Sequence, residues 1–203
     1  MNIINVEQGS PEWFHSRLGK ITASNFDKVI TSTLKQSSQV ESLINIAVSE
    51  LLLGEPIDTF TSDAMARGKD LEDEALSTVN FITGLDFKKV GFIDSGRGYG
   101  CSPDGLCDGY GLELKCPLIQ NHVEYLAGGE LPKKYLAQVQ GSMAVTGFKE
   151  WYFCSYHPGV KPLIVRVDRD DEYCSKLIEY LEEASCEILR RYEALKSDFM
   201  VAA

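Results

Sequence analysis

The chain has 203 residues, 44% hydrophobic and 25% charged, and its 30 acidic and 20 basic residues give a formal net charge of -10 at pH 7. This length and composition are typical of one globular domain, 1–203, and no membrane partner is expected, because no segment approaches the roughly 20 apolar residues of a bilayer span. The acidic balance lowers the expectation of a nucleic-acid partner without excluding one, because net charge does not describe how charge is distributed.

Four helices are predicted in the first half of the chain, where apolar residues recur every three or four positions between capping and helix-ending residues. They cover about 10–18, 22–30, 40–53 and 62–81. The first begins at Ser10-Pro11, a capping hydroxyl before a proline, and ends at Gly19. The third is stopped by Gly54.

The second half changes to the alternating pattern of strands. Strands are predicted at 87–93, 99–102, 112–116, 151–156 and 163–167, and helices at about 132–145 and 170–195. The turn-forming run Asp108-Gly109-Tyr110-Gly111 separates the second strand from the third. This order of elements predicts an α/β (α+β) fold in which helices flank a small mixed sheet.

Six cysteines are spread over the second half, at 101, 107, 116, 154, 174 and 186. They form no C-x-x-C pair and no regular framework, and the N-terminus lacks the pattern of a signal peptide. We therefore expect reduced, mostly buried thiols in a cytoplasmic protein. A zinc site built from the first three cysteines and a histidine is an alternative, but their spacing fits no zinc ligand pattern.

The segment CSPDGLCDGYGLELKCP, 101–117, concentrates candidate catalytic residues. On a strand, residues two apart share a face, so Glu113 and Lys115 project together while Leu114 points into the core. The Leu114 carbonyl still lies between them, and with Asp104 it completes an all-oxygen ligand set of the kind Mg²⁺ and Mn²⁺ prefer. Lys115 can then orient or deprotonate a water. The alternative is a hairpin with surface acids and an ordinary Glu-Lys pair.

Three further residues stand out. Glu72 falls on the apolar stripe of its predicted helix, where a carboxylate must be paired, for example with Arg67, or bound to metal. Gln138 lies among the inward-facing residues of KKYLAQVQGSMAVTG, although glutamines on helices are usually solvated. Arg17 precedes a predicted helix start carrying Ser24, which suits a terminal phosphate, although a surface arginine beside a plain cap is the simpler interpretation.

Five motifs occur in order along the chain. W-x3-R-L-G-x-I-T-A-S begins at Trp13, R-G-x2-L-E at Arg67, C-S-P-D-G-L at Cys101, G-L-E-L-K-C-P at Gly111 and A-Q-V-Q at Ala137. Together with the strand segment EWYFCSYHPG, they resemble the lambda exonuclease family of phage recombination nucleases (YqaJ-type alkaline exonucleases). The pattern P-D-x8-E-x-K is that of the wider PD-(D/E)xK superfamily, so the resemblance implies its restriction-endonuclease-like core.

The resemblance also implies an activity: a metal-dependent 5′→3′ exonuclease, a phosphodiester hydrolase that degrades one strand of linear duplex DNA to mononucleotides and leaves a 3′ overhang. Carried over by motif, Asp104, Glu113 and the Leu114 carbonyl would hold Mg²⁺, with Mn²⁺ as a substitute. Glu72 would support a second ion or its waters. Lys115 would activate or position the attacking water, and Gln138 would orient it.

For DNA ends, the same resemblance implies that Arg17, Ser24 and Ser102 contact a 5′ phosphate. Met65 lies where the family has an apolar wedge that unpairs the end.

Family members form a ring-shaped homotrimer around DNA and hand the overhang to a single-strand annealing protein. The expected setting is the cytoplasm of a bacterial or phage-infected cell. In such a ring, basic residues need only line the channel while the outside stays negative. The candidates for this lining are Lys28, Lys35, Arg67, Lys69, Lys133 and Lys134.

Two kinds of alternative function stay open. Within the superfamily, the chain could be a PD-(D/E)xK endonuclease, or an iron–sulfur nuclease, although Cys174 and Cys186 alone cannot supply a four-thiolate site. Outside catalysis, it could be a DNA-interaction protein that kept the fold, or an acidic DNA mimic. The intact set of Asp104, Glu113 and Lys115 argues against this loss of activity.

Overall fold

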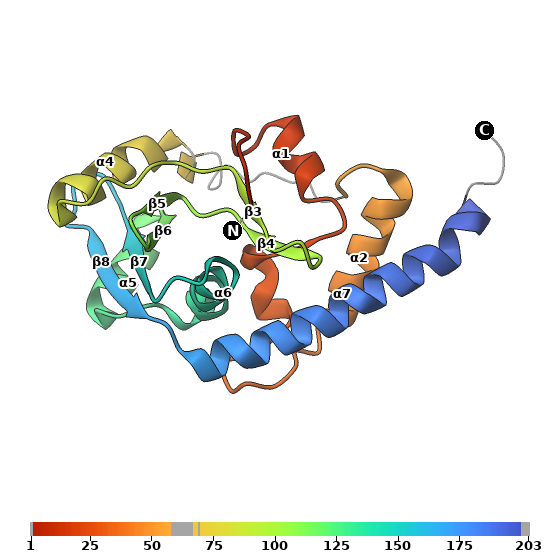
Figure 1. Cartoon of the computed structure of the whole chain (residues 1–203). Helices are drawn as coiled ribbons and strands as arrows, with labels where there is room; N and C mark the ends of the chain where they lie inside the picture. The colour runs from red at the N-terminus through yellow and green to blue at the C-terminus, as the bar shows by residue number, and fades with distance from the viewer. Residues whose placement is uncertain (1, 58–66, 69, 200–203) are drawn as a thin grey trace.

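The computed structural model describes residues 2–57, 67–68 and 70–199. Its strands form two four-stranded sheets, each with parallel and antiparallel pairs, and helices flank them (Figure 1). The predicted α/β fold is therefore confirmed, with two small mixed sheets where one was expected.

The first sheet has the strand order β1-β3-β4-β2. Its members are β1 (Asn2–Ile4), β3 (Phe92–Asp94), β4 (Tyr99–Cys101) and β2 (Ile21–Thr22). The helix predicted from residue 22 is wrong in its first residue and its type, because Thr22 closes β2 and a 3-10 helix, η1 (Ala23–Lys28), follows. The Thr22 hydroxyl gives that helix no cap, since it hydrogen-bonds Arg17 and Ser24 instead.

The second sheet has the order β5-β6-β7-β8 and carries the residues of the site. Its members are β5 (Gly105–Cys107), β6 (Tyr110–Lys115), β7 (Glu150–Ser155) and β8 (Leu163–Asp168). Asp108 and Gly109 connect β5 to β6 with φ of 30° and 92°, the left-handed conformation that a two-residue hairpin turn requires. The register pairs Gly105 with Leu112, which brings residue 104 beside the end of β6.

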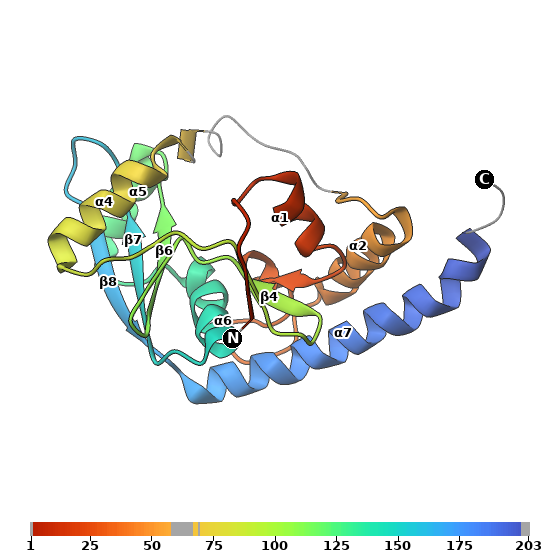
Figure 2. The same ribbon diagram turned by 45° about the horizontal axis from the view of Figure 1, so that its top comes forward.

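Helices cover both faces of the second sheet. Besides η1, the described residues form α1 (Pro11–Ser16), α2 (Val40–Leu53), α4 (Glu72–Thr83), α5 (Ile119–Gly128), η2 (Lys133–Tyr135), α6 (Leu136–Thr146) and α7 (Asp171–Phe199). Apolar residues of α4 pack with Leu112 and Leu114 on one face, and those of α6 pack with Trp151 on the other. The long helix α7 runs along α6 and α2 (Figure 2).

Some elements differ from their predicted extents. The helix at 40–53 is confirmed at both ends, whereas the strand expected at 87–93 is reduced to β3, with Lys88 in an isolated bridge to Leu106. Strand β5 and helix α5 were not predicted. Helix α5 follows Leu118, which offers no capping side chain, so the sequence carries no start signal there. Of the helix predicted at 62–81, residues 62–66 lie outside the described residues.

None of the helices in the described part of the chain is long and apolar enough to cross a membrane. All six cysteines are free thiols. Cys101, Cys154 and Cys174 are buried, so the expectation of mostly buried thiols holds for half of them.

Candidate active site

Strand β6 places two charged side chains on the face that α6 covers. Leu112 and Leu114 point toward α4 and are buried there, so Glu113 and Lys115 project from the opposite face, as the two-residue spacing predicts. The Lys115 ammonium lies 2.5 Å from a Glu113 carboxylate oxygen. From α6, Gln138 donates a hydrogen bond of 2.6 Å to the same oxygen.

Asp104 lies at the edge of β6, where the hairpin register brings it. Its backbone N–H donates to the Leu112 carbonyl at 3.0 Å, and its carboxylate accepts the Leu114 N–H at 2.5 Å. The carbonyl of Lys115 accepts from Tyr156 on the β7 side, so Leu114 turns its own N–H and C=O the other way, toward Asp104. The Asp104 carboxylate and the Leu114 carbonyl thus share one edge of the strand.

Burial shifts the pKa values of Glu113, Asp104 and Lys115. Glu113 is only 2% exposed, and this desolvation, together with the charges of Asp104 and Glu72, raises its pKa to about 7 although Lys115 opposes the shift. Burial also raises the pKa of Asp104, against the opposing effects of Lys115 and the Leu114 N–H. Burial alone lowers the pKa of Lys115, but the two carboxylates outweigh it and raise that pKa above its ordinary value. Lys115 is therefore an ammonium at neutral pH, and it compensates the buried acids.

A cavity of about 770 Å³ opens beside this edge. Asp104, Leu114 and Glu72 line it, and Lys89 lies at its wall in an ion pair of 2.6 Å with Asp73. No group of three or more His, Cys, Asp or Glu side chains in the described residues is arranged to hold a metal ion. The oxygen donors that fit a hard cation here are the carboxylates of Asp104 and Glu113 and the Leu114 carbonyl, with Glu72 facing the same cavity.

Gln8 supports this edge from the N-terminal segment, a contact that sequence reasoning missed. Its side-chain amide donates to the carbonyl of Val90 at 2.8 Å and to that of Pro103 at 2.9 Å. Pro103 immediately precedes Asp104, so one amide fixes the peptide that carries the aspartate. No local pattern in the sequence signals this contact.

A second cluster forms around Arg17. Its guanidinium stacks 3.6 Å from the centre of the Trp13 ring and donates to the Thr22 hydroxyl at 3.1 Å, and Thr22 bonds Ser24 at 3.2 Å. The Trp13 indole donates to Ser102 at 3.0 Å, which connects Arg17 with both predicted serines.

The guanidinium of Arg17 is not fully satisfied. Burial lowers its pKa to about 10, although the charge of Glu50 opposes the shift. Its Nε is buried, and no hydrogen-bond partner for it lies within the described ranges. A half-buried cation with a spare, buried donor beside two hydroxyls is chemically suited to an anion.

Arg67 and Tyr135 belong neither to the metal-ligand candidates nor to the Arg17 cluster. Met65 and Lys69 lie outside the described residues. Arg67 donates to the carbonyls of Cys116 and Pro117, at 3.4 and 3.3 Å. Tyr135, which was not singled out from the sequence, places its ring centre 5.4 Å from the Lys115 ammonium.

Comparisons with known proteins find a family model and solved structures that are similar to this chain. A family model described as a YqaJ-like viral recombinase domain matches residues 12–149. The chain is similar to an alkaline exonuclease from Laribacter hongkongensis, with a TM-score of 0.84 and 31% identity over 93% of this chain and 97% of that one. The structure of that exonuclease in complex with dAMP gives a TM-score of 0.83 at the same identity and coverage.

A phage-related exonuclease from Haemophilus somnus 129PT is similar in fold, with a TM-score of 0.65 and 16% identity over 88% of this chain and 96% of that one. No curated protein matches the chain.

Proposed function

The chain belongs to the lambda exonuclease-like family of YqaJ-like viral recombinase domains, and from this premise we propose that it is a metal-dependent 5′→3′ exonuclease. It degrades one strand of linear double-stranded DNA to mononucleotides and leaves 3′ overhangs for recombination by strand annealing. One observation carries the proposal: at the end of β6, the Asp104 carboxylate and the Leu114 carbonyl lie on one edge of the strand, next to the Glu113–Lys115 ion pair.

Mg²⁺, or Mn²⁺ in its place, would be held by Asp104, Glu113 and the Leu114 carbonyl, and when bound it supplies a Lewis acid for the phosphate and a more acidic water. Glu72 faces the same cavity and would support a second ion or its waters. Because Lys115 is an ammonium, it positions the attacking water and offsets negative charge on the phosphate. Gln138 holds the Glu113 carboxylate, and on phosphate binding its amide can orient the water.

The Arg17 cluster would bind the 5′-terminal phosphate. Arg17 has a buried donor to offer, and Ser24 and Ser102 bring hydroxyls beside it. Ser102 is two residues from Asp104, so a strand end anchored here lies close to the cleavage edge. This closeness supports removal of nucleotides from the end rather than cleavage at internal sites.

The remaining parts of the proposal come from the family. They are a homotrimeric ring around linear duplex, a single-strand annealing protein as partner, and Met65 as the wedge that unpairs the end.

The decisive experiment is digestion of end-labelled linear duplex with Mg²⁺, with and without a 5′ phosphate, beside closed circular duplex. We expect mononucleotide release from the 5′ end, faster with the phosphate, and no cutting of circles. Cutting of closed circles would favour an endonuclease, and no release at all would favour a non-catalytic DNA-binding protein.

A further inference from the structure

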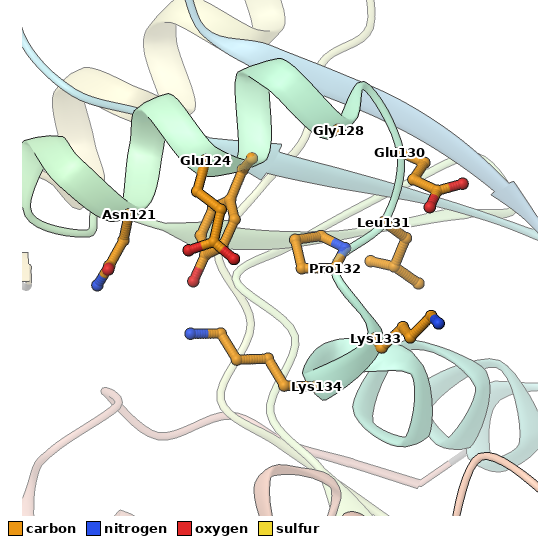
Figure 3. A pocket seen from close by; sticks show the side chains of 9 residues that line it. Asn121, Glu124, Gly128, Glu130, Leu131, Pro132, Lys133 and Lys134 are labelled. Atoms are coloured by element: carbon orange, nitrogen blue, oxygen red, sulfur yellow. The ribbon is translucent and has the colours of Figure 1, made fainter.

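A second cavity lies between α5 and η2, on the same side of the sheet as Lys115. Its volume is about 380 Å³, within the range of small-ligand sites. Asn121, Glu124 and Tyr125 line it from α5, and Lys133 and Lys134 line it from η2 (Figure 3). The catalytic proposal above uses none of these side chains.

Lys134 is held in place at the edge of this cavity. Its ammonium lies 5.1 Å from the centre of the Tyr125 ring and 5.0 Å from that of Tyr135. Those two rings meet edge to face at 6.2 Å, so two aromatic rings together position the lysine ammonium. Among the described residues, no carboxylate forms an ion pair with Lys134, so its charge is not neutralised by direct contact.

Tyr135 connects this cavity with the cleavage edge. Lys115 and Lys134 lie 5.4 Å and 5.0 Å from the centre of that one ring. A DNA strand whose scissile phosphate is at Lys115 therefore has another phosphate, one or two nucleotides along, within reach of Lys134.

The cavity is not suited to anions in general, because the carboxylates of Glu124 and Glu130 line it as well. Figure 3 shows the Lys134 ammonium directed toward Asn121 and Glu124, whereas Lys133 and Glu130 lie at the other end. The chemistry at the Lys134 end is one fixed cation, the Asn121 amide and one opposing acid. Such a set suits a single phosphodiester rather than a multiply charged ligand.

We propose that this cavity is a strand-binding site: Lys134 and Asn121 contact a phosphodiester of the DNA strand next to the cleaved bond. The inference rests on the proposed nuclease function. Tyr125 and Tyr135 act through Lys134 as positioning residues. The Glu124 carboxylate limits the affinity of the site for the phosphodiester, so that the strand can dissociate and advance after each cleavage.

Binding of fluorescein-labelled oligo(dT) without a 5′ phosphate, measured by anisotropy in EDTA over a range of KCl concentrations, tests the site without cleavage. We expect Lys134→Met, which keeps the apolar stem on the two rings, to weaken binding several-fold and to reduce the salt slope by about 0.7. Glu124→Gln should strengthen binding. Lys133→Met is the matched control and should change the slope less.

The inference is overturned if the salt slope is unchanged in Lys134→Met or if Lys133→Met loses as much affinity for the oligonucleotide. It is also overturned if Glu124→Gln does not bind more tightly. Competition with dTMP distinguishes the phosphodiester of a DNA strand from the phosphate of a free nucleotide. If dTMP displaces the labelled oligonucleotide as well as unlabelled oligo(dT) does, the cavity is a product site instead. Since metal is chelated throughout, failure of the nuclease proposal appears separately, as absent nucleotide release with Mg²⁺ by the wild-type protein.

Discussion

Gln138 on α6 donates a hydrogen bond of 2.6 Å to Glu113 on β6, although 25 residues separate the two in the chain. The same carboxylate oxygen pairs with Lys115 at 2.5 Å. Because Glu113 is almost completely buried, these two donors replace the water that an ionised carboxylate otherwise needs. The position of the candidate metal ligand therefore depends on how α6 packs against the sheet.

Lys115→Ala should abolish most cleavage. Loss of an ammonium beside the developing phosphate charge is expected to lower kcat by on the order of 10²–10³-fold. Binding of duplex DNA should persist, because the other contacts of the site remain. The measurement is single-turnover release of nucleotide from end-labelled duplex, with Lys88→Ala as the control, since that side chain is exposed and forms an ion pair with Asp86. Turnover near the wild-type rate would remove Lys115 from the mechanism.

The pairing of Glu113 with Lys115 was predictable, because a strand places residues two apart on one face whatever surrounds it. The hairpin turn at Asp108-Gly109 was predictable for a similar local reason, since these residue types tolerate positive φ. A role for Gln138, the orientation of the attacking water, came only from motif resemblance, because a glutamine on a helix is usually solvated; its hydrogen bond to Glu113 was not predicted. In the structure, the Gln138 amide lies 2.6 Å from the Glu113 carboxylate.

Other parts of the site depend on long-range contacts that no local pattern encodes. Gln8 reaches carbonyls 82 and 95 residues away. Strand β5 has three residues, begins with a glycine and is held by its pairing with β6 and by the bridge from Leu106 to Lys88. For the same reason, the second sheet could not be separated from the first by periodicity alone.

Metal affinity should depend on pH through Glu113. Its folded pKa of about 7 means that the carboxylic acid form dominates below that pH, so a bound cation must displace a proton there. Affinity for Mg²⁺ should fall about tenfold per unit as pH decreases below 7 and should level off above it. Calorimetry in two buffers of different ionisation enthalpy at pH 6 detects the released proton. Glu113→Gln should remove that proton release, and Asp104→Ala should weaken metal binding at every pH.

Arg17→Gln should reduce the preference for 5′-phosphorylated over 5′-hydroxyl ends. Besides its hydrogen bond to Thr22 and its contact with the Trp13 ring, the guanidinium carries a buried donor with no partner among the described residues, so the substitution also removes the donor that we assign to the anion. We expect at least a tenfold fall in the ratio of the two digestion rates, the effect of losing one charge-assisted contact. Arg97→Gln is the control, because Arg97 is exposed and pairs with Glu182. An unchanged ratio in Arg17→Gln would place the phosphate pocket elsewhere.

Gln8→Leu should weaken metal binding without removing any ligand. The substitution leaves the Val90 and Pro103 carbonyls without their donor, which costs about 1–3 kcal/mol of stability and loosens the peptide before Asp104. The expected signature is a higher Mg²⁺ concentration for half-maximal activity with near-wild-type kcat at saturating Mg²⁺. A merely structural role would lower stability and leave the Mg²⁺ dependence unchanged.

Gly141→Ala tests how closely α6 must pack. A Cβ built at Gly141 lies 2.1 Å from a ring carbon of Phe26 and 3.0 Å from a methyl of Leu177, and both side chains are fully buried. Neither neighbour has free space to enter, so we expect destabilisation of about 1–3 kcal/mol in urea unfolding. Because α6 also carries Gln138, the displaced helix should lower cleavage in parallel.

Gly128→Ala is the matched control for this prediction, since a Cβ built at Gly128 meets no atom of the described residues within 4 Å and alanine is the better helix former. Phe26→Leu should restore part of the stability when combined with Gly141→Ala, because the smaller side chain makes room for the added methyl. If Gly141→Ala alone is as stable as wild type while cleavage is lost, the helix acts on the site by some route other than packing distance. If stability falls and cleavage does not, the Gln138–Glu113 contact tolerates a shift of α6 and contributes little to positioning the carboxylate.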